Sequence, residues 1–283
     1  MLGAHMSISG GFDQAARRAR QAGCDCLQIF VKNQRRWHAP PIEEAAVRNW
    51  RRARNAARTG PVVAHSTYLI NLAAPVAVVR HRSLLALVDE LRRCEQLGIG
   101  DLVLHPGCHM GRGEKAGLRR VASALRAALE RTESTRTRIL LETTAGQGTA
   151  LGGCFEHLSE LLERAASPVR LGVCLDTCHV FAAGYDIRTV KGYMRAMNRL
   201  DSAVGLGRVG CIHLNDSKAA CGSRVDRHEH VGEGMIGRIA FKCLVNDTRL
   251  EHIPMILETP KGRDSRGRDL DRVNLARLRR MRR

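Results

Sequence analysis

The stretch Ile139-Leu140-Leu141-Glu142 is an apolar run that ends in a carboxylate, and the same pattern returns along the chain. Five more short runs end in a histidine or a carboxylate: Val62–His65, Leu102–His105, Val173–Asp176, Gly210–His213 and Met255–Glu258. Continuous apolar runs rich in Val, Ile and Leu are typical of parallel strands that are buried on both faces. We therefore expect parallel strands that each carry a polar side chain at the carboxyl end.

The rest of the chain alternates with these runs. Two further apolar runs, at residues 2–7 and 24–31, bring the predicted strands to eight. Apolar residues return with helical spacing between strands, at 46–57, 84–94, 118–129 and 155–162, and we expect Ser83 to cap the second of these helices. This alternation predicts an α/β chain with a single (β/α)8 TIM barrel over residues 1–262. Residues 263–283 are expected to form a basic, partly helical C-terminal extension.

The charge balance favours a polyanionic partner. Lys and Arg number 46 against 28 Asp and Glu, which leaves a formal net charge of +18. Guanidinium groups suit phosphate contacts, although charge alone supports only non-specific nucleic-acid binding. The arginines at 48, 51, 52 and 58 fall on one helix face and are expected to be solvated. Arg279, Arg280, Arg282 and Arg283 are expected to be free to add non-specific DNA affinity.

Other features of the composition indicate an intracellular protein without a membrane span. The chain contains no run of 18 apolar residues, which a membrane-spanning helix requires. Its start lacks the charged and apolar regions of a signal peptide. Ten cysteines without regular spacing are typical of free thiols rather than of a disulfide framework.

The polar strand ends predict a polynuclear metal site. The carboxyl ends of barrel strands meet at one face, where the chemistry of such barrels lies. The long loop at 215–234 adds Asp226 and His228, which point to the same side if the loop is extended there. Burying so many of these groups without partners is costly, so a structural role does not account for them. The mixture of imidazole and carboxylate favours zinc, with Mn²⁺ or Fe as substitutes.

Several longer motifs extend this interpretation. They are Lys32-Asn33-Gln34-Arg35, His65-Ser66-Thr67-Tyr68, His105-Pro106-Gly107, Cys174-Leu175-Asp176-Thr177-Cys178-His179, His213-Leu214-Asn215-Asp216-Ser217-Lys218 and Gly222-Ser223-Arg224-Val225-Asp226-Arg227-His228. In this order they resemble the endonuclease IV family of apurinic/apyrimidinic (AP) endonucleases, also called AP endonuclease family 2, in the xylose isomerase-like TIM barrel superfamily. The resemblance runs from about Gly3 to Thr259, and it implies a barrel that holds three zinc ions.

The resemblance also implies which residues bind each ion. His65, His105 and Glu142 are implied for the first zinc. A bridging Glu142 with Asp176, His213 and Glu258 is implied for the second, and His179, Asp226 and His228 are implied for the third. Glu142 is thus the implied catalytic residue, as a ligand shared by two metals. His5, at the end of the first strand, is expected to support these ligands.

The implied substrate is duplex DNA that contains an abasic site. The resemblance assigns Arg35 and Tyr68 to filling the gap in the base stack, with Asn33 and Gln34 as nearby DNA contacts. It implies hydrolysis of the phosphodiester bond 5′ to the abasic site, which leaves a 3′-hydroxyl and a 5′-deoxyribose phosphate in base excision repair. We expect a monomer in the cytoplasm or nucleoid of a prokaryote, or in the nucleus of a eukaryote.

The sequence departs from the family motif at one position, and two alternative functions compete with the endonuclease. Thr143 stands where the family commonly has Asn, so a hydrogen bond behind the ligands is expected to be lost or altered. The first alternative is a divalent-metal sugar isomerase or epimerase on a related barrel, which does not account for Asp226, His228 or the loop at 32–35. The second is a non-catalytic basic nucleic-acid-binding protein, which would still bind after removal of metal.

Overall fold

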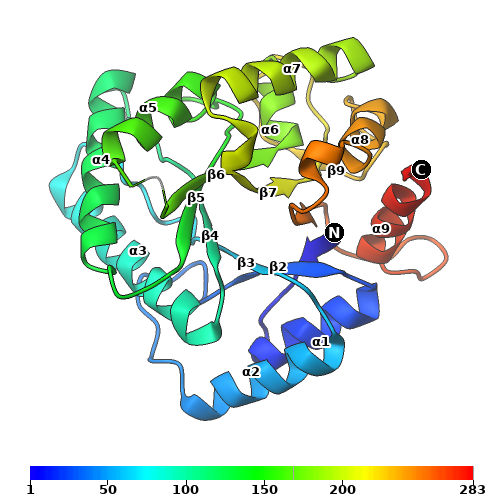
Figure 1. The fold of residues 1–283 in the computed structure, drawn as a ribbon, viewed down its shortest axis with the longest axis horizontal. Helices are drawn as coiled ribbons and strands as arrows, with labels where there is room; N and C mark the ends of the chain where they lie inside the picture. Colours follow the sequence, from blue (N-terminus) through cyan, green and yellow to red (C-terminus); the bar gives the residue numbers. More distant parts are fainter. Residues whose placement is uncertain (168, 283) are drawn as a thin grey trace.

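The computed structural model describes residues 1–167 and 169–282 and shows a closed barrel of eight parallel strands (Figure 1). The strands are β1 (Leu2–His5), β2 (Cys26–Phe30), β3 (Val62–His65), β4 (Asp101–Leu104), β5 (Arg138–Glu142), β6 (Leu171–Asp176), β7 (Val209–His213) and β10 (Met255–Leu257). Pairing between β1 and β10 closes the barrel. The predicted TIM barrel is confirmed, and each of the six quoted runs forms a strand.

The two faces of each strand are buried in different places. One set of side chains fills the barrel interior: Cys26, Val63, Val103, Leu140, Cys174, Cys211 and Ile256. Their neighbours along each strand point outward and pack in the larger core beneath the helices. Because side chains alternate along a strand, burial on both sides requires the continuous apolar runs seen in the sequence.

Helices surround the barrel in chain order (Figure 1). The ring contains α1 (Phe12–Ala22), α2 (Glu44–Ala57), α3 (Ala77–Leu97), α4 (Glu114–Glu130), α5 (Phe155–Ala165), α7 (Val190–Ala203), α8 (Arg238–Val245) and α9 (Leu270–Met281). The short α6 (Thr177–Ala182) directly follows β6. Trp50 anchors α2 by donating its indole N–H to the Leu97 carbonyl, while Arg48, Arg51 and Arg52 are exposed as expected.

The predicted cap at Ser83 is wrong. Helix α3 begins at Ala77, so Ser83 lies inside the helix and is fully buried. Its hydroxyl donates to the Val79 carbonyl and accepts from the Asn71 backbone N–H. Serine inside a helix commonly bonds back to the carbonyl four residues earlier. Here the hydroxyl also ties the preceding loop to the helix.

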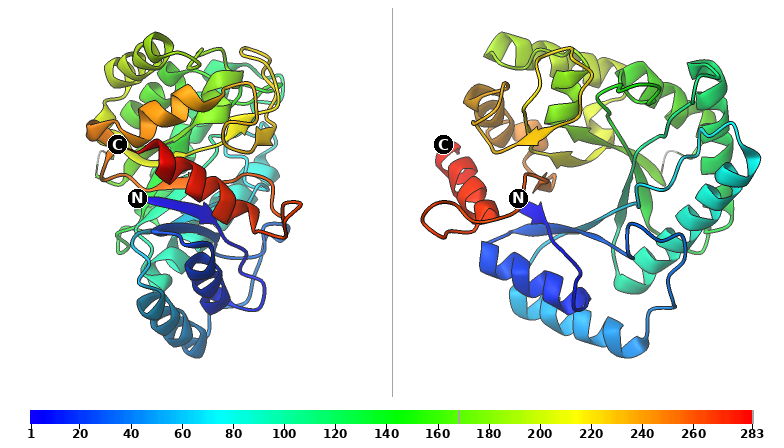
Figure 2. Two further views of the ribbon diagram at one scale, coloured as in Figure 1. Left: turned by 90° about the vertical axis from the view of Figure 1, so that its right-hand side faces the viewer. Right: turned by 180° about the vertical axis from the view of Figure 1, so that it is seen from behind.

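The C-terminal segment packs on the barrel through α9. This helix contacts α8 and β1, and it buries Leu275 and Leu278 (Figure 2). The helix expected in this segment is therefore present, whereas the domain boundary at residue 262 stays a prediction. The expectation that Arg279 is free is wrong, because its guanidinium donates to the Gly23 carbonyl and pairs with Asp25. Arg283 lies outside the described residues.

The long loop after β7 is held in place by a buried carboxylate. A small antiparallel ladder pairs β8 (Asp216–Ser217) with β9 (His228–Glu229). The Asp216 carboxylate is inaccessible and accepts hydrogen bonds from the backbone N–H groups of Ser217, Gly232 and Ile236. These bonds place the segment with Asp226 and His228 at the carboxyl end of the barrel.

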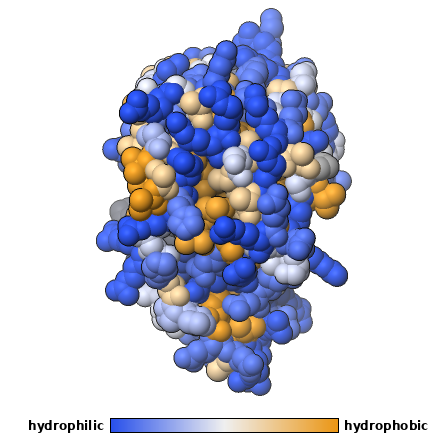
Figure 3. Space-filling model, turned by 90° about the vertical axis from the view of Figure 1, so that its left-hand side faces the viewer, coloured by the Kyte–Doolittle hydropathy of each residue, from blue (hydrophilic) through white to orange (hydrophobic). Residues whose placement is uncertain are grey.

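One face of the molecule is mainly polar. On the side where α3 and α4 lie, hydrophilic residues dominate and hydrophobic ones form separate small groups (Figure 3). Among the described helices, none combines the length and apolar character needed to cross a membrane. All ten cysteines are free thiols.

Candidate metal centre

Glu142 lies at the middle of a cluster of histidines at the carboxyl end of the barrel. Its side chain is inaccessible to solvent. Oε2 lies 2.8 Å from His105 Nε2 and 3.2 Å from His65 Nε2. Oε1 lies 3.0 Å from His213 Nδ1 and 3.3 Å from His179 Nδ1. One carboxylate therefore contacts imidazoles from the ends of β3 and β7, from the residue after β4 and from helix α6.

Several groups of three or four possible ligand residues have ligand atoms that lie within 4.8 Å of one another, and three of these groups contain only histidines and carboxylates from the strand ends, α6 and the loop after β7. The sets are His65, His105 and Glu142; Glu142, Asp176, His213 and Glu258; and His179, Asp226 and His228. These are the same three sets that the resemblance implies, so the structure brings all nine residues together. Glu142 belongs to two of the sets. A buried carboxylate with two oxygens is suited to bridging two cations.

The charges in this cluster support one another. Burial alone would raise the pKa of the Glu142 carboxyl, but His105 and His213 outweigh it and hold that pKa well below its ordinary value. The same opposition of burial and His213 lowers the pKa of Glu258. Burial lowers the pKa of His228, yet Asp176 and Asp226 raise it to about 9. The carboxylates thus create a field that favours positive charge.

One buried atom points to a missing partner. His228 Nε2 lies 3.2 Å from Asp226 Oδ1, but it makes no hydrogen bond to any described residue and is buried. A buried nitrogen without a hydrogen bond is costly unless another group completes it. Beside it, His179 Nε2 lies 3.1 Å from Asp226 Oδ2. Imidazole nitrogens and carboxylate oxygens are the donors that zinc takes, so the residues present fit such an ion.

Hydrogen bonds behind these residues fix their orientation. The Asn215 amide donates to Asp176 Oδ2 at 2.6 Å, and its oxygen accepts from the Glu258 backbone N–H at 2.8 Å. The Thr143 hydroxyl accepts from the Asp176 N–H, and the Thr143 carbonyl lies 2.8 Å from His179 Nδ1. Thr143 therefore keeps a supporting role at this position, with its hydroxyl serving a backbone group.

Gln28 is not among the predicted site residues. It lies inside β2 and is fully buried. Its Oε1 lies 2.8 Å from His213 Nε2, and its Nε2 donates to Glu258 Oε1 at 2.6 Å. Gln28 therefore leaves the His213 Nδ1 atom free to face Glu142. The same amide lies 3.0 Å from His5 Nδ1, which places His5 behind Glu258, as expected. The available signal was one polar residue inside the apolar run Cys26–Phe30.

The residues expected to contact DNA lie at the rim of this centre. Tyr68 is 65% exposed, and its ring centroid lies 5.6 Å from that of His65. Asn33 and Arg35 are exposed and Gln34 is half-buried. Lys32, from the same motif, is instead buried and pairs with Asp89 and Glu90. The centre thus combines a buried ligand cluster with exposed aromatic and basic side chains.

Comparisons with known proteins agree with this geometry. A sequence profile described as "Xylose isomerase-like TIM barrel" matches residues 16–281. "Probable endonuclease 4" of Chloroflexus aurantiacus is 54% identical over 278 residues, covering 98% of this chain and 96% of the relative. The protein of the same name from Geobacter sulfurreducens is 46% identical over 99% of this chain and 94% of its own length.

A solved structure agrees with these sequence relatives. The crystal structure of endonuclease IV from Thermus thermophilus superposes with a TM-score of 0.86 at 37% identity, covering 99% of this chain and 98% of that one. The chain belongs to the endonuclease IV family. A D-tagatose 3-epimerase-like protein, 18% identical with a TM-score of 0.73, shares the barrel, and at that identity the likeness concerns the fold alone. For endonuclease IV the match extends over the whole barrel and through α9.

Proposed function

We propose that this protein is a zinc-dependent DNA-repair endonuclease. It hydrolyses the phosphodiester bond 5′ to an abasic site in duplex DNA and leaves a 3′-hydroxyl and a 5′-deoxyribose phosphate, as a monomer inside the cell, in base excision repair. The observation that carries the proposal is the position of Glu142, shared by two of the three ligand sets. Membership of the endonuclease IV family and the net charge of +18 support DNA as the substrate.

The residues of the three ligand sets would bind the metal ions, and neighbouring side chains orient those residues. Zinc ions, or Mn²⁺ or Fe in their place, supply Lewis-acid stabilisation of phosphate charge and lower the pKa of water when bound. Glu142 holds the first two sets together, and Asn215 and Gln28 keep Asp176, His213 and Glu258 oriented. His179, Asp226 and His228 form the third set at the outer side, where the loop after β7 lies.

The exposed rim selects the damaged nucleotide. An abasic nucleotide has no base to unpair or unstack, so flipping it out of the duplex costs less than flipping an intact one. Tyr68 and Arg35 fill the gap that it leaves, and Asn33 and Gln34 contact the DNA beside it. Tyr68 suits this role because its side chain is largely exposed, while its ring centroid lies 5.6 Å from that of His65 and 5.7 Å from that of Phe30.

Metal removal tests the function directly. The protein is incubated with duplex DNA carrying one abasic-site analogue, with and without a chelator, and the strands are resolved. We expect one cut on the 5′ side, loss of the cut with chelator, and recovery with added Zn²⁺. Binding that survives chelation without any cleavage at full metal load would establish the non-catalytic alternative. Epimerisation of a ketohexose by a protein that leaves the abasic duplex uncut would establish the sugar-enzyme alternative.

Alanine at Tyr68 or Arg35 is expected to weaken discrimination between abasic and intact duplex. Stacking of an aromatic side chain on a base contributes about 1–3 kcal/mol, so the ratio of the two affinities should fall by roughly 10-fold. Bound zinc should stay unchanged, because neither side chain belongs to a ligand set. Arg52→Ala, an exposed change on α2, is the control. Equal discrimination in all three variants would mean that Tyr68 and Arg35 are surface residues that do not contribute to recognition of the abasic site.

A further inference from the structure

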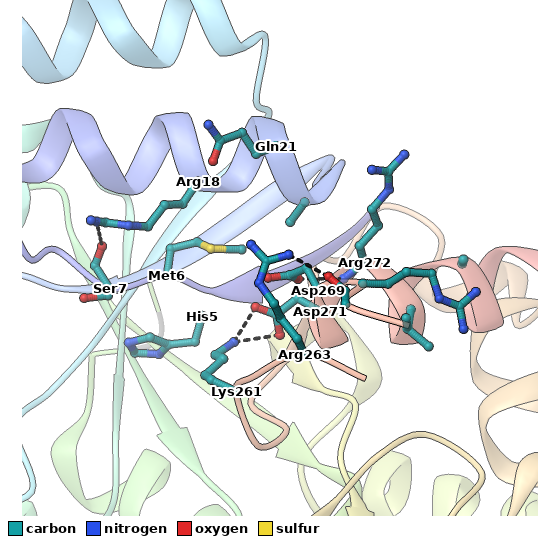
Figure 4. A pocket seen from close by; sticks show the side chains of 15 residues that line it. His5, Met6, Ser7, Arg18, Gln21, Lys261, Arg263, Asp269, Asp271 and Arg272 are labelled. Atoms are coloured by element: carbon teal, nitrogen blue, oxygen red, sulfur yellow. Dashed lines mark hydrogen bonds and ion pairs between the residues drawn. The ribbon is translucent and has the colours of Figure 1, made fainter. Parts of the chain in front are cut away.

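A basic groove lies beside the metal centre, at the seam where the barrel closes. A cavity of about 850 Å³ opens between the end of β1, helix α1 and the segment that leads into α9 (Figure 4). His5 lines one end of the cavity, and its Nδ1 lies 3.6 Å from Glu258 Oε1. The groove and the metal centre therefore share a wall. Residues between 261 and 276 form the opposite wall.

The groove has an excess of positive charge. Its lining includes Arg18, Lys261, Arg263, Arg268 and Arg272, against Asp269 and Asp271. Two of these cations are neutralised by carboxylates: Lys261 lies 2.8 Å from both Asp271 oxygens, and Arg268 lies 2.7 Å from an Asp264 oxygen.

The remaining three cations keep their charge. Arg18 donates to the Ser7 and Ser9 carbonyls, which hold its guanidinium at the groove without neutralising it (Figure 4). Arg263 donates to the Gly267 carbonyl in the same way. Arg263 and Arg272 are exposed, and neither forms an ion pair with a described carboxylate. A surplus of guanidinium groups at one groove suits phosphate oxygens.

The acidic residue of the lining that pairs with none of these cations is Asp269, and it caps a helix. Asp269 accepts a hydrogen bond from the Arg272 backbone N–H, which caps α9. Its carboxylate is therefore directed at the helix end, where the backbone N–H groups favour negative charge. The positive charge of the groove is left for a ligand from outside the chain.

The direction of α9 decides which of its arginines can face the substrate. The helix begins after the loop that follows β10, at the carboxyl end of the barrel. It ends near Asp25, which precedes β2 and accepts from the Leu2 backbone N–H at the amino end of the strands. Arg280 and Arg282 therefore lie at the end of the barrel opposite to Glu142. Arg263 and Arg272 lie at the end that carries the metal centre.

The geometry points to this groove as a binding track for backbone phosphates of the duplex flanking the cleaved bond. The inference rests on the proposed function, because it takes DNA as the substrate of the adjacent centre. Contacts of this kind position a duplex without reading its sequence. The groove thus accounts for the DNA affinity that the sequence alone led us to expect from the last few arginines.

Salt-dependent binding tests the groove. The double variant Arg263→Gln/Arg272→Gln, at and before the start of α9, is compared with Arg280→Gln/Arg282→Gln, which removes the same charge at the other end of that helix. Each phosphate contact contributes about 0.9 to the slope of log affinity against log salt, so the groove variant should lose about 1.8. Between 50 and 200 mM salt, the fold-decrease in affinity should therefore be about 12 times smaller for the groove variant than for the parent. The control variant should keep the parent slope.

Two duplexes separate this inference from the proposed function. The slope is measured with an uncleaved abasic analogue and with intact duplex of the same sequence. Because phosphates are common to both, the groove variant should lose the same slope on each and keep the parent's ratio of affinities. Equal slopes for the groove and control variants overturn the groove whatever the cleavage assay shows. A parent protein that binds DNA with the expected slope but never cuts overturns the proposed function and leaves the groove in place.

Discussion

Glu142→Gln should reduce cleavage by roughly 10³-fold, which corresponds to about 4 kcal/mol in activation free energy. Glutamine has nearly the same shape, so the barrel should fold, but it loses the negative charge that faces four histidines at 2.8–3.3 Å. Without that charge two ligand sets lose their shared member, and bound metal should fall. Activity is measured on the abasic duplex and metal content by elemental analysis of the same sample.

The matched control is Glu156→Gln on α5. This carboxylate is 56% exposed and pairs with Arg199 at the surface, so its loss should leave cleavage and metal content unchanged. Circular dichroism should report the parent fold for both variants. Parent-like turnover in Glu142→Gln would contradict the shared-ligand arrangement. Loss of activity with a full metal load would mean that Glu142 acts on the substrate and not through the metals.

The strand-end pattern made the barrel and most of the centre predictable. Parallel strands bring their carboxyl ends to one face, so a ligand at the end of each apolar run needs no further information to be placed. His65, Asp176 and His213 are each the last residue of a strand. The pair Asp226 and His228 was predictable for a similar reason, because alternate residues of an extended segment share a side.

Roles that depend on contacts across the barrel were not predictable in this way. Gln28 lies in the middle of an apolar strand, and only the register of β2 against its neighbours directs it at His213 and Glu258. Thr143 lacks the amide expected there, and its part comes from a hydroxyl facing the Asp176 backbone. The pairing of Arg279 with Asp25 likewise had to be seen, because helical spacing does not tell which residue the end of a helix meets.

Lys32 and Glu90 illustrate the same limit, and they lead to the second large expected effect. Both side chains are inaccessible, with Lys32 Nζ 3.3 Å from Glu90 Oε1. Glu90 also accepts from the Thr67 backbone N–H at 3.2 Å. Lys32 precedes Asn33 and Thr67 precedes Tyr68, so this pair joins the two segments that carry the expected DNA contacts. Burial raises the pKa of the Glu90 carboxyl, and the nearby Lys32 ammonium counters that rise.

Glu90→Ala should therefore destabilise the protein by about 3–5 kcal/mol, because it removes one partner of a buried ion pair, leaves the buried Thr67 N–H without its acceptor and leaves Asp89 as the remaining carboxylate beside Lys32. At about 2 °C per kcal/mol for a chain of this size, the melting temperature should fall by roughly 6–10 °C. Glu44→Ala breaks the pair with Arg48, whose glutamate is 93% exposed, and should cost less than about 1 kcal/mol. Equal melting temperatures for the two variants would contradict the importance of the buried pair.

The double variant Lys32→Met/Glu90→Leu separates stability from positioning. Replacing both charges with apolar groups of similar size removes the cost of an unpaired ion, so most of the melting temperature should return. The hydrogen bond that Glu90 accepts from Thr67 does not return, and neither does the link from Lys32 Nζ to the Trp37 carbonyl at 3.2 Å. Discrimination between abasic and intact duplex should therefore be lower than the parent's in a stable protein with its full metal content. Parent-like discrimination in the stable double variant would mean that the pair contributes to folding alone and does not position the DNA contacts.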